Sequence, residues 1–577
     1  MNIKTYFPIF EWISSYQKSW LKADILAGIT VGVMLIPQGI AYAMIAGLPP
    51  IYGLYTAMIP QVVYAILGTS RQLSVGPAAM DSLIVASGIS ALATIGSEHF
   101  ITFAILLAFM VGLFQILFGF FKLGFLVNFL SRPVISGFTT GSAIIIATNQ
   151  IGNLLGINIQ RNNRLLSLSK DVFSEILNIN LLTFSIGAIS IIIIILFKRY
   201  AKKIPASLIV VILGILVVYL FNLKDFGIAI IGEIPKGLPH LKLPDFDKSM
   251  ISELSSLGLT LALIAFMEAI SIAKSIEVNH NDYKVKPNQE LVAIGFGNLI
   301  GSFFQTYPAT AGLARSAVND QSGAKTPLSS IFSALIVGVT LLFLTPLFYY
   351  LPKTILAAII IVAAYGLLDF TMPKKLINYN IRDLIILNAT LLVTVFIGIK
   401  EGILLGVVLS IVMLIYKSTK PHIAVLGNVA GTHYYRNIKR FDNLVINNET
   451  LIIRFDAQLY FANTTYFKDK LQELAKEKGD DLKLIIIDGD SINALDSSAI
   501  YALEEMLDYF NNLNISVAFT GIKGPVRDTL AKSGLMKKIR YDHCFMNIQE
   551  AIDCFDQMCL TDKKTKSYQE YIKQINR

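Results

Sequence analysis

The chain has 577 residues, of which 54% are hydrophobic and only 15% are charged. An ordinary soluble domain carries about 25% charged residues, and the mean hydropathy of this chain is +0.59. These values exclude an ordinary soluble protein, a disordered chain and a disulfide-rich scaffold. The formal net charge is +9, and its positive excess lies in residues 1–440, whereas residues 441–560 are acidic. The composition predicts a polytopic membrane protein with an attached domain, whose basic residues indicate topology and lipid contact, not nucleic-acid binding.

Long apolar segments recur along the first 420 residues. Because a bilayer core about 30 Å thick needs about 20 apolar residues in a helix, each long segment predicts a membrane span. The long candidates lie near 23–45, 51–68, 99–121, 126–156, 181–200, 204–221, 254–276, 325–350, 353–370, 381–399 and 401–417, and shorter or broken ones lie near 74–95, 289–304 and 306–320. The sequence predicts about fourteen spans in all.

Lysine and arginine clusters predict the orientation of these spans. Basic residues follow alternate spans, for example at 198–203, 274–286 and 374–382. By the positive-inside rule that side is cytoplasmic, and an even number of spans places both termini there. Residues 1–22 lack a short apolar stretch with a cleavage site, so we expect a cytoplasmic N-terminal segment and no removed signal peptide. The expected location is the cell membrane, an inner or plasma membrane.

Two proline-containing motifs lie at corresponding places in the two halves of the membrane region. SVGPAAMDSLIV places Pro77 before an apolar run, and TYPATAGLARSAVND places Pro308 before a similar run of small residues. Proline suits the first position of a helix, so we expect each to begin a short half-helix. Because each half has about seven spans, an odd number, the second half is inserted into the membrane upside down relative to the first. Broken helices at matching places in the two halves then predict an anion site at their N-termini, near the midplane of the membrane. The alternative is two unrelated proline-capped helices.

The character of the sequence changes after about residue 420. Strand-like runs such as LIIRFD and LKLIIID alternate with helical stretches such as DSSAIYALEEMLDYFNNLN. This alternation predicts a small α/β domain with a mostly parallel core. The expected domains are a transmembrane domain at 23–420 (repeats at about 23–221 and 254–418), an α/β domain at 440–560 and a basic tail at 561–577.

Four polar residues lie within or beside the membrane segments of the two repeats. A charge at the bilayer centre costs several kcal/mol unless it is paired or faces water, which makes Asp81, Glu268 and Arg315 candidate functional residues. The alternative for each is a structural ion pair or a passive place on a cavity wall. Gln38 is uncharged, and its amide can donate either to an anion or to a neighbouring helix.

Motifs of soluble enzymes are absent from the sequence. SGAKTP lacks the spacing of a P-loop, and GFGNLIG has its third glycine one position too far along for a dinucleotide-binding turn. The six histidines are scattered, and Cys544, Cys554 and Cys559 match no zinc or redox pattern, so we expect reduced thiols. The sequence therefore predicts no enzyme, no metal site and no cofactor, and it disfavours ATP-driven transport.

Two long motifs closely resemble the signatures of the SulP family of anion transporters: GLPPIYGLYTAMIPQVVYAILGTSRQLSVGPAA (47–79) and NQELVAIGFGNLIGSFFQTYPATAGLARSAVNDQSGAKTPLS (288–329). The resemblance covers nearly the whole chain. It implies an α-helical membrane protein with two seven-segment inverted repeats, split into core and gate domains and followed by a cytoplasmic STAS domain. It also implies a homodimer and secondary transport of a small anion.

Matching by motif assigns the substrate-binding positions that the resemblance implies. Gln38 and Tyr42 fall where the family lines its anion site from the first span, and Ala78 and Ala79 fall on the first half-helix. Arg315 falls on the basic position after the second half-helix.

The matching also marks where this chain departs from the pattern. Ala314 stands where relatives often carry a hydroxyl, which removes one expected donor. Glu268 falls on the acidic position of the eighth span, which the family links to ion coupling. Asp81 has no counterpart in the pattern and is the second coupling candidate.

The segment IDGDSINALDSSAIYALEEML resembles the loop and helix of a STAS domain. In bacterial anti-sigma-factor antagonists, which share this fold, a serine after the aspartate is phosphorylated, and Ser497 or Ser498 would be that residue. Ala499 replaces the usual glycine, and the alternative is a structural role at the start of the helix.

The sequence favours a proton-coupled transporter of an inorganic anion, with sulfate as the first candidate because PATAGLARSAVN resembles the sulfate-permease branch. Protonation of Glu268 would remove a negative charge beside the anion, so that proton and anion binding favour each other. Sodium would need several oxygen ligands, and only Ser271 offers a hydroxyl one turn on. The alternatives are a bicarbonate, chloride or dicarboxylate transporter or exchanger, an uncoupled anion channel, and a membrane-tethered signalling protein.

Overall fold

The computed structural model describes all residues except 1–6, 126–130, 158, 160–164, 201–205 and 557–577. The predicted basic tail, Cys559 and part of the basic cluster at 198–203 lie outside the described residues. The chain divides into two compact units, Met1–Ser410 and Ile411–Arg577.

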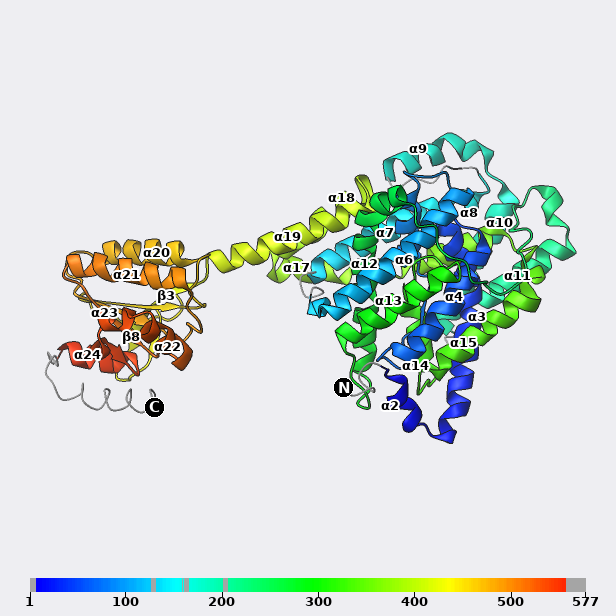
Figure 1. Cartoon of the computed structure of the whole chain (residues 1–577). Helices are drawn as coiled ribbons and strands as arrows, with labels where there is room; N and C mark the ends of the chain where they lie inside the picture. Colours follow the sequence, from blue (N-terminus) through cyan, green and yellow to red (C-terminus); the bar gives the residue numbers. More distant parts are fainter. Residues whose placement is uncertain (1–6, 126–130, 158, 160–164, 201–205, 557–577) are drawn as a thin grey trace. The chain divides into compact units, whose positions relative to one another are not determined.

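The first unit is almost entirely helical (Figure 1). After the short α2 (Ile9–Ser14), its first half contains α3 (Leu21–Ile45), α4 (Pro50–Leu67), α5 (Ala79–Ile89), α6 (Glu98–Phe120), α7 (Arg132–Asn149), α8 (Ile151–Leu155), α9 (Leu165–Glu175), α10 (Leu181–Tyr200) and α11 (Ala206–Leu220). Its second half contains α12 (Lys248–Glu277), α13 (Pro287–Phe303), α14 (Leu313–Gln321), α15 (Leu328–Val339), α16 (Lys353–Tyr365), α17 (Thr371–Tyr379), α18 (Ile381–Phe396) and the beginning of α19 (Ile399–Thr419), which continues into the second unit. Within the described residues, seven helices are long and apolar enough to cross a membrane, and four further apolar helices are shorter.

A two-stranded sheet joins the two halves of this unit. Strand β1 (Val75–Gly76) precedes α5, β2 (Thr310–Ala311) precedes α14, and the two pair antiparallel. The prediction that Pro77 and Pro308 begin the half-helices is therefore wrong. Helix α5 begins two residues after Pro77, and α14 begins five residues after Pro308, because the intervening residues are extended and partly paired in the sheet.

The helices of the first unit pack in two groups. The first helix group consists of α3, α4, α6, α12, α13 and α15, and the half-helices α5 and α14 both contact α3 and α12. The second helix group consists of α7, α10, α11, α16, α18 and α19. Within the first group, α3 and α4 cross so closely that a Cβ at Gly53 would overlap the carbonyl of Gly39, a contact that only glycine permits.

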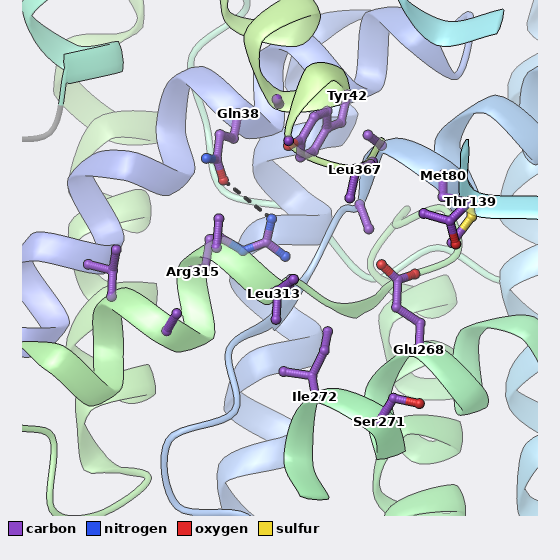
Figure 2. Close-up of a pocket in the computed structure, with 18 of the residues that line it drawn as sticks. Gln38, Tyr42, Met80, Thr139, Glu268, Ser271, Ile272, Leu313, Arg315 and Leu367 are labelled. Carbon is purple, nitrogen blue, oxygen red and sulfur yellow. Dashed lines mark hydrogen bonds between the residues drawn. The ribbon is translucent and has the colours of Figure 1, made fainter. Parts of the chain in front are cut away.

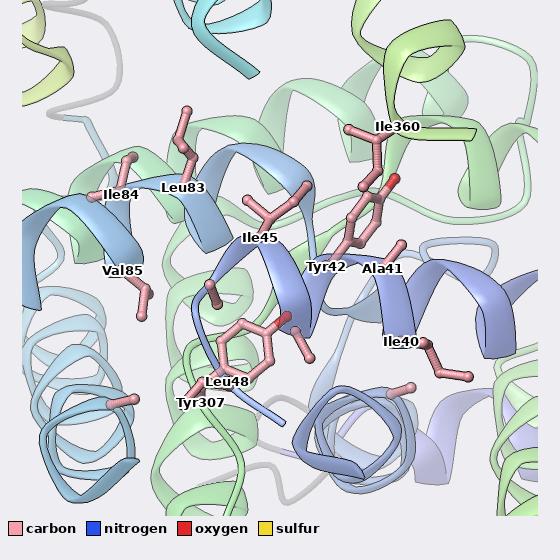
Figure 3. Packing of buried hydrophobic residues seen from close by; sticks show 14 of the residues in the cluster. Ile40, Ala41, Tyr42, Ile45, Leu48, Leu83, Ile84, Val85, Tyr307 and Ile360 are labelled. Carbon is pink, nitrogen blue, oxygen red and sulfur yellow. The ribbon is translucent and has the colours of Figure 1, made fainter. Parts of the chain in front are cut away.

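Buried side chains fix the half-helices against their neighbours. Figure 3 shows Tyr42 and Ile45 of α3, Leu83 of α5 and Tyr307 packed within one hydrophobic cluster. A fully buried carboxylate fixes the segment after α4. Glu290 of α13 accepts hydrogen bonds from the Tyr64 hydroxyl and the Thr69 backbone N–H, each at 2.7 Å, and from the Thr69 hydroxyl. These contacts place the start of β1, and with it α5.

The second unit is an α/β domain around a seven-stranded sheet. Its strands are β3 (Ile423–Val429), β4 (Tyr435–Asn437), β5 (Leu444–Val445), β6 (Thr450–Phe455), β7 (Leu484–Asp488), β8 (Ser516–Thr520) and β9 (Cys544–Phe545). Its helices are α20 (Thr464–Lys478), α21 (Ser497–Asn512), α22 (Gly524–Lys532), α23 (Leu535–Ile539) and α24 (Ile548–Asp556).

Strands β6 to β9 pair parallel in chain order, as the alternating pattern predicts. Hydrophobic clusters cover both faces of this sheet, which explains why β7 is a continuous apolar run. The sheet begins earlier than the predicted residue 440, because β3 pairs antiparallel with β6. Within the described residues neither Cys544 nor Cys554 takes part in a disulfide, and burial raises the pKa of Cys544 to about 12.

Candidate functional site

A cavity of about 550 Å³ lies between the two helix groups of the first unit. Most of the residues predicted to bind substrate or a coupling ion line it, from α3, α5 and its N-cap, α12 and α14. They are Gln38, Tyr42, Ala78, Ala79, Glu268, Ala314 and Arg315.

Arg315 is the central basic residue of this cavity. It lies in the first turn of α14, not after the half-helix as the sequence indicated, because α14 begins only at Leu313. Its Nη1 donates to the Pro77 carbonyl at 2.8 Å and to Gln38 Oε1 at 3.4 Å (Figure 2). Arg315 is therefore held by groups from the first half of the chain, although it belongs to the second.

Two donor atoms of Arg315 remain unused. The residue is only 2% exposed, and among the described residues Nε and Nη2 have no hydrogen-bond partner. A buried donor without an acceptor costs about 1–3 kcal/mol, so this guanidinium favours a ligand that brings oxygen acceptors. Gly312 allows the arrangement, because a Cβ there would lie 2.5 Å from Arg315 Cζ.

The N-termini of both half-helices border the same cavity. The residues that precede them, Ala78 and Gly312, are extended, and no side chain caps either helix. Ala78, Ala79, Leu313 and Ala314 line the cavity. The first N–H groups of a helix have no partner within it and carry the positive end of its dipole. The two helix ends and Arg315 therefore direct positive charge toward the same cavity.

Glu268 is the acidic residue of the cavity wall. It projects from α12 into the space that Arg315 approaches from α14, as Figure 2 shows. Among the described residues its Oε2 is buried without a hydrogen-bond partner. The same cavity is thus lined by a carboxyl group and a guanidinium group, each with buried atoms that lack hydrogen-bond partners among the described residues.

Asp81 occupies a different place from the other predicted residues. It lies in the first turn of α5, but it is not among the residues that line the cavity, and it is 1% exposed. Both of its carboxyl oxygens are buried and have no hydrogen-bond partner in the described part of the chain. The next residue, Ser82, shares a hydrogen bond of 3.0 Å with the Tyr307 hydroxyl. The structure therefore places Asp81 behind the cavity wall.

The two sides of the cavity differ in chemistry. The charged residues come from α12 and α14, whereas the second helix group contributes mainly apolar side chains. These are Val134, Ile135, Phe138, Ile194, Ile359, Val362, Leu367 and Ile403. Thr139 of α7 also lines the cavity with its hydroxyl, and it was not predicted because it lies in an ordinary apolar span.

The two serines proposed as phosphorylation sites lie at the start of α21. Ser497 is exposed, and Ser498 is partly buried. The helix is capped by neither serine, since Asp496 Oδ1 accepts from the Ala499 N–H at 2.8 Å. Asp496, and not either serine, therefore has the structural role of capping the N-terminus of α21.

Comparisons with known proteins agree with this architecture. The family model described as the sulfate permease family matches residues 21–390, and the STAS domain model matches residues 443–551. Sulfate transporter 4.1, chloroplastic, of Arabidopsis thaliana is 38% identical, over 97% of this chain and 83% of its own length. Sulfate transporter 3.2 of the same plant is 32% identical, over 99% of this chain and 92% of its own length.

Solved structures share the fold. A structure of SLC26A9 superposes with a TM-score of 0.87 at 25% identity, covering 97% of this chain and 93% of that chain. The transmembrane domain of a cyanobacterium bicarbonate transporter, BicA, gives a TM-score of 0.59 at 24% identity, covering 69% of this chain and 98% of that chain. The predicted multi-pass membrane fold with two inverted repeats and a C-terminal STAS domain is confirmed.

Proposed function

Because the chain belongs to the sulfate permease family, a family of transporters and not of enzymes, we propose that it is a secondary active transporter of an inorganic anion, sulfate first. The observation that carries this proposal is Arg315, a buried guanidinium near two half-helix N-termini, with two donor atoms that have no partner in the part of the chain that the structure describes. A tetrahedral dianion presents several oxygens to such a set of donors. Relatives named as sulfate transporters support sulfate over bicarbonate, chloride and dicarboxylates.

The proposed mechanism is alternating access. The groups that would hold the anion belong to the first helix group and its half-helices, which β1 and β2 join. The second helix group offers a mainly apolar wall. Movement of one group past the other would change access to the cavity without breaking the anion's hydrogen bonds.

Glu268 is the proposed proton-coupling residue. Its carboxyl group lines the same cavity as Arg315 and has a buried oxygen without a partner in the described part of the chain. Protonation would remove a negative charge from beside the anion, so the anion and the proton would each favour the binding of the other. Asp81, buried behind the wall, is the second candidate for this role.

The proposal places the chain in the cell membrane, with the lipid bilayer around the first unit and both termini in the cytoplasm. It includes a homodimer. Native mass spectrometry from mild detergent tests the dimer, and accessibility of single cysteines at both ends of the chain tests the topology.

Uptake into proteoliposomes tests the substrate and the coupling ion together. Sulfate, bicarbonate, chloride and a dicarboxylate are offered with a proton gradient, a sodium gradient or neither. We expect sulfate to accumulate only with an inward proton gradient. Glu268→Gln should retain anion exchange and lose acceleration by protons, whereas Glu253→Gln, an exposed position on the same helix, should behave as wild type. Proton-driven accumulation by Glu268→Gln would exclude Glu268 as the coupling residue, and a current with no accumulation would favour a channel.

A further inference from the structure

A second cavity, of about 240 Å³, lies in the first unit away from the anion site. It forms where α2 meets the segment after α4 and the segment between α12 and α13. The two cavities share no lining residue. Helix α4 ends at Leu67, α12 ends at Glu277 and α13 begins at Pro287. Because these membrane helices end here, the second cavity lies at the membrane surface and not at the midplane.

The second cavity carries an excess of positive charge. Its lining includes Arg71, Lys284 and Lys286, against the acids Glu11 and Asp282. Arg71 pairs closely with Asp282, at 2.7 Å, and Lys286 lies 3.8 Å from Glu11. Lys284 has no ion pair among the described residues. The lining holds three cations against two acids, and Lys286 is only loosely paired, although Glu277 outside the lining also acts electrostatically on Lys284. The lining therefore attracts an anion.

An unpaired donor points to the same kind of ligand. Trp12 of α2 lines the cavity and is 5% exposed. Its indole N–H is buried and lacks a hydrogen-bond partner within the described residues. Indole N–H is a donor only, so it favours an acceptor that the cavity admits. A neutral donor beside lysine and arginine suits a group with several anionic oxygens, such as a phosphate.

The outer face of α2 indicates where such a phosphate comes from. Phe7, Phe10 and Ile13 are exposed by 44%, 50% and 52%, while Trp12 points inward. Exposed aromatic and aliphatic side chains next to basic residues at the ends of membrane helices are typical of a segment in the lipid interface. Anionic lipid headgroups concentrate at that depth on the cytoplasmic side.

We propose that the second cavity binds the phosphate of an anionic phospholipid, with Lys284, Lys286 and the Trp12 indole N–H as its ligands and with α2 lying in the membrane interface. The inference is independent of the transported anion. It assigns the N-terminal segment a role in lipid recognition.

The site also links segments that lead to the transport residues. Arg71 lies over the ring of Tyr283, with Cζ 5.6 Å from the ring centroid, and the Tyr283 hydroxyl donates to Gln72 Oε1 at 2.8 Å. The first of these segments continues into β1 and α5, and the second follows α12. A bound lipid would hold α2 against both, so lipid binding should stabilise the folded membrane domain.

The test uses the purified full-length chain in detergent and in nanodiscs of phosphatidylcholine with or without phosphatidylglycerol. Native mass spectrometry identifies the lipid that the protein retains, and the midpoint of thermal unfolding measures its stability. We expect retention of phosphatidylglycerol over phosphatidylcholine and a higher unfolding midpoint in the anionic nanodiscs. The double variant Lys284→Gln/Lys286→Gln should bind phosphatidylglycerol about tenfold or more weakly. The matched pair Lys236→Gln/Lys242→Gln, also exposed, should behave as wild type.

Trp12→Phe separates a ligand role from a packing role, because it removes the N–H and keeps an aromatic ring. We expect it to weaken lipid retention while leaving the unfolding midpoint in phosphatidylcholine unchanged. Equal retention of phosphatidylglycerol by the wild type and the Lys284/Lys286 double variant would overturn the proposal. If inorganic phosphate raises the unfolding midpoint of the lipid-free protein as much as phosphatidylglycerol does, the site binds free phosphate and the proposal of a lipid ligand is overturned.

Discussion

Replacement of Arg315 tests the anion site most directly, because lysine and alanine there separate charge from hydrogen bonding. Lysine keeps the positive charge, but its single ammonium group cannot bind the Pro77 carbonyl and also reproduce the geometry of Nε and Nη2. A hydrogen bond to a charged group contributes about 1.5–3 kcal/mol. Arg315→Lys should lose one of the two bonds from Nε and Nη2 to the anion, so we expect it to bind the anion about 10- to 150-fold more weakly. Arg315→Ala should lose both bonds, so we expect it to bind about 150-fold or more weakly.

Equilibrium binding of radiolabelled sulfate to the purified protein measures these affinities. Thermal unfolding without the anion establishes that each variant is folded. Arg436→Lys, at an exposed position of β4, is the matched control and should bind as wild type. If folded Arg315→Ala binds sulfate with wild-type affinity, the anion does not contact this guanidinium and the proposed site is in the wrong place.

Three further outcomes follow from local contacts. Ala314→Ser adds a hydroxyl to a cavity-lining position, and we expect about fivefold tighter sulfate binding; unchanged affinity would mean that residue 314 does not face the anion. Glu290→Ala leaves four buried donors unpaired, at about 1–3 kcal/mol each, so it should lower the thermal unfolding midpoint, whereas exposed Glu253→Ala should not. Burial acts to raise the pKa of Asp456, but hydrogen bonds, chiefly from Arg454, outweigh it and lower that pKa. This stabilisation is present at neutral pH and is lost progressively as the pH falls below about 4, so hydrogen exchange of β6 should distinguish Asp456→Asn from wild type at pH 7 and by a decreasing margin as the pH falls below about 4.

The membrane architecture was predictable because the bilayer imposes a strong constraint on composition. A span needs about 20 apolar residues, and the predicted segments correspond to the helices from α3 to α19 except α9 and α17, which no predicted segment covers. The alternation of strands and helices likewise predicted the parallel strands β6, β7 and β8. In both regions, the local composition of a segment indicates directly whether the element is buried in an apolar environment.

Contacts between distant segments were not predictable in the same way. The Pro77 carbonyl, a partner of Arg315, lies 238 residues away in the sequence, and although a local motif marks Pro77, no local pattern predicts this hydrogen bond. The pairing of β1 with β2 delays the start of α14 to Leu313. Proline alone indicated an earlier start, because the first helical position is where proline fits best. The change of character near residue 420 coincides with the start of β3, but its antiparallel pairing with β6, which makes it part of the sheet, has no local signal.

The candidate site draws on both repeats, because each repeat contributes one of the two half-helices that border the cavity. A single half-helix would offer one dipole end in a cavity largely surrounded by apolar side chains. Pairing β1 with β2 brings the second end beside the first, and the bond from Arg315 to the Pro77 carbonyl holds a full charge between them. These contacts all lie within one body, which can carry a bound anion as a unit. The second helix group makes few polar contacts with the cavity, so its displacement costs no anion hydrogen bonds. Under the proposed mechanism, affinity is then set within the first helix group, and access is set between the two groups.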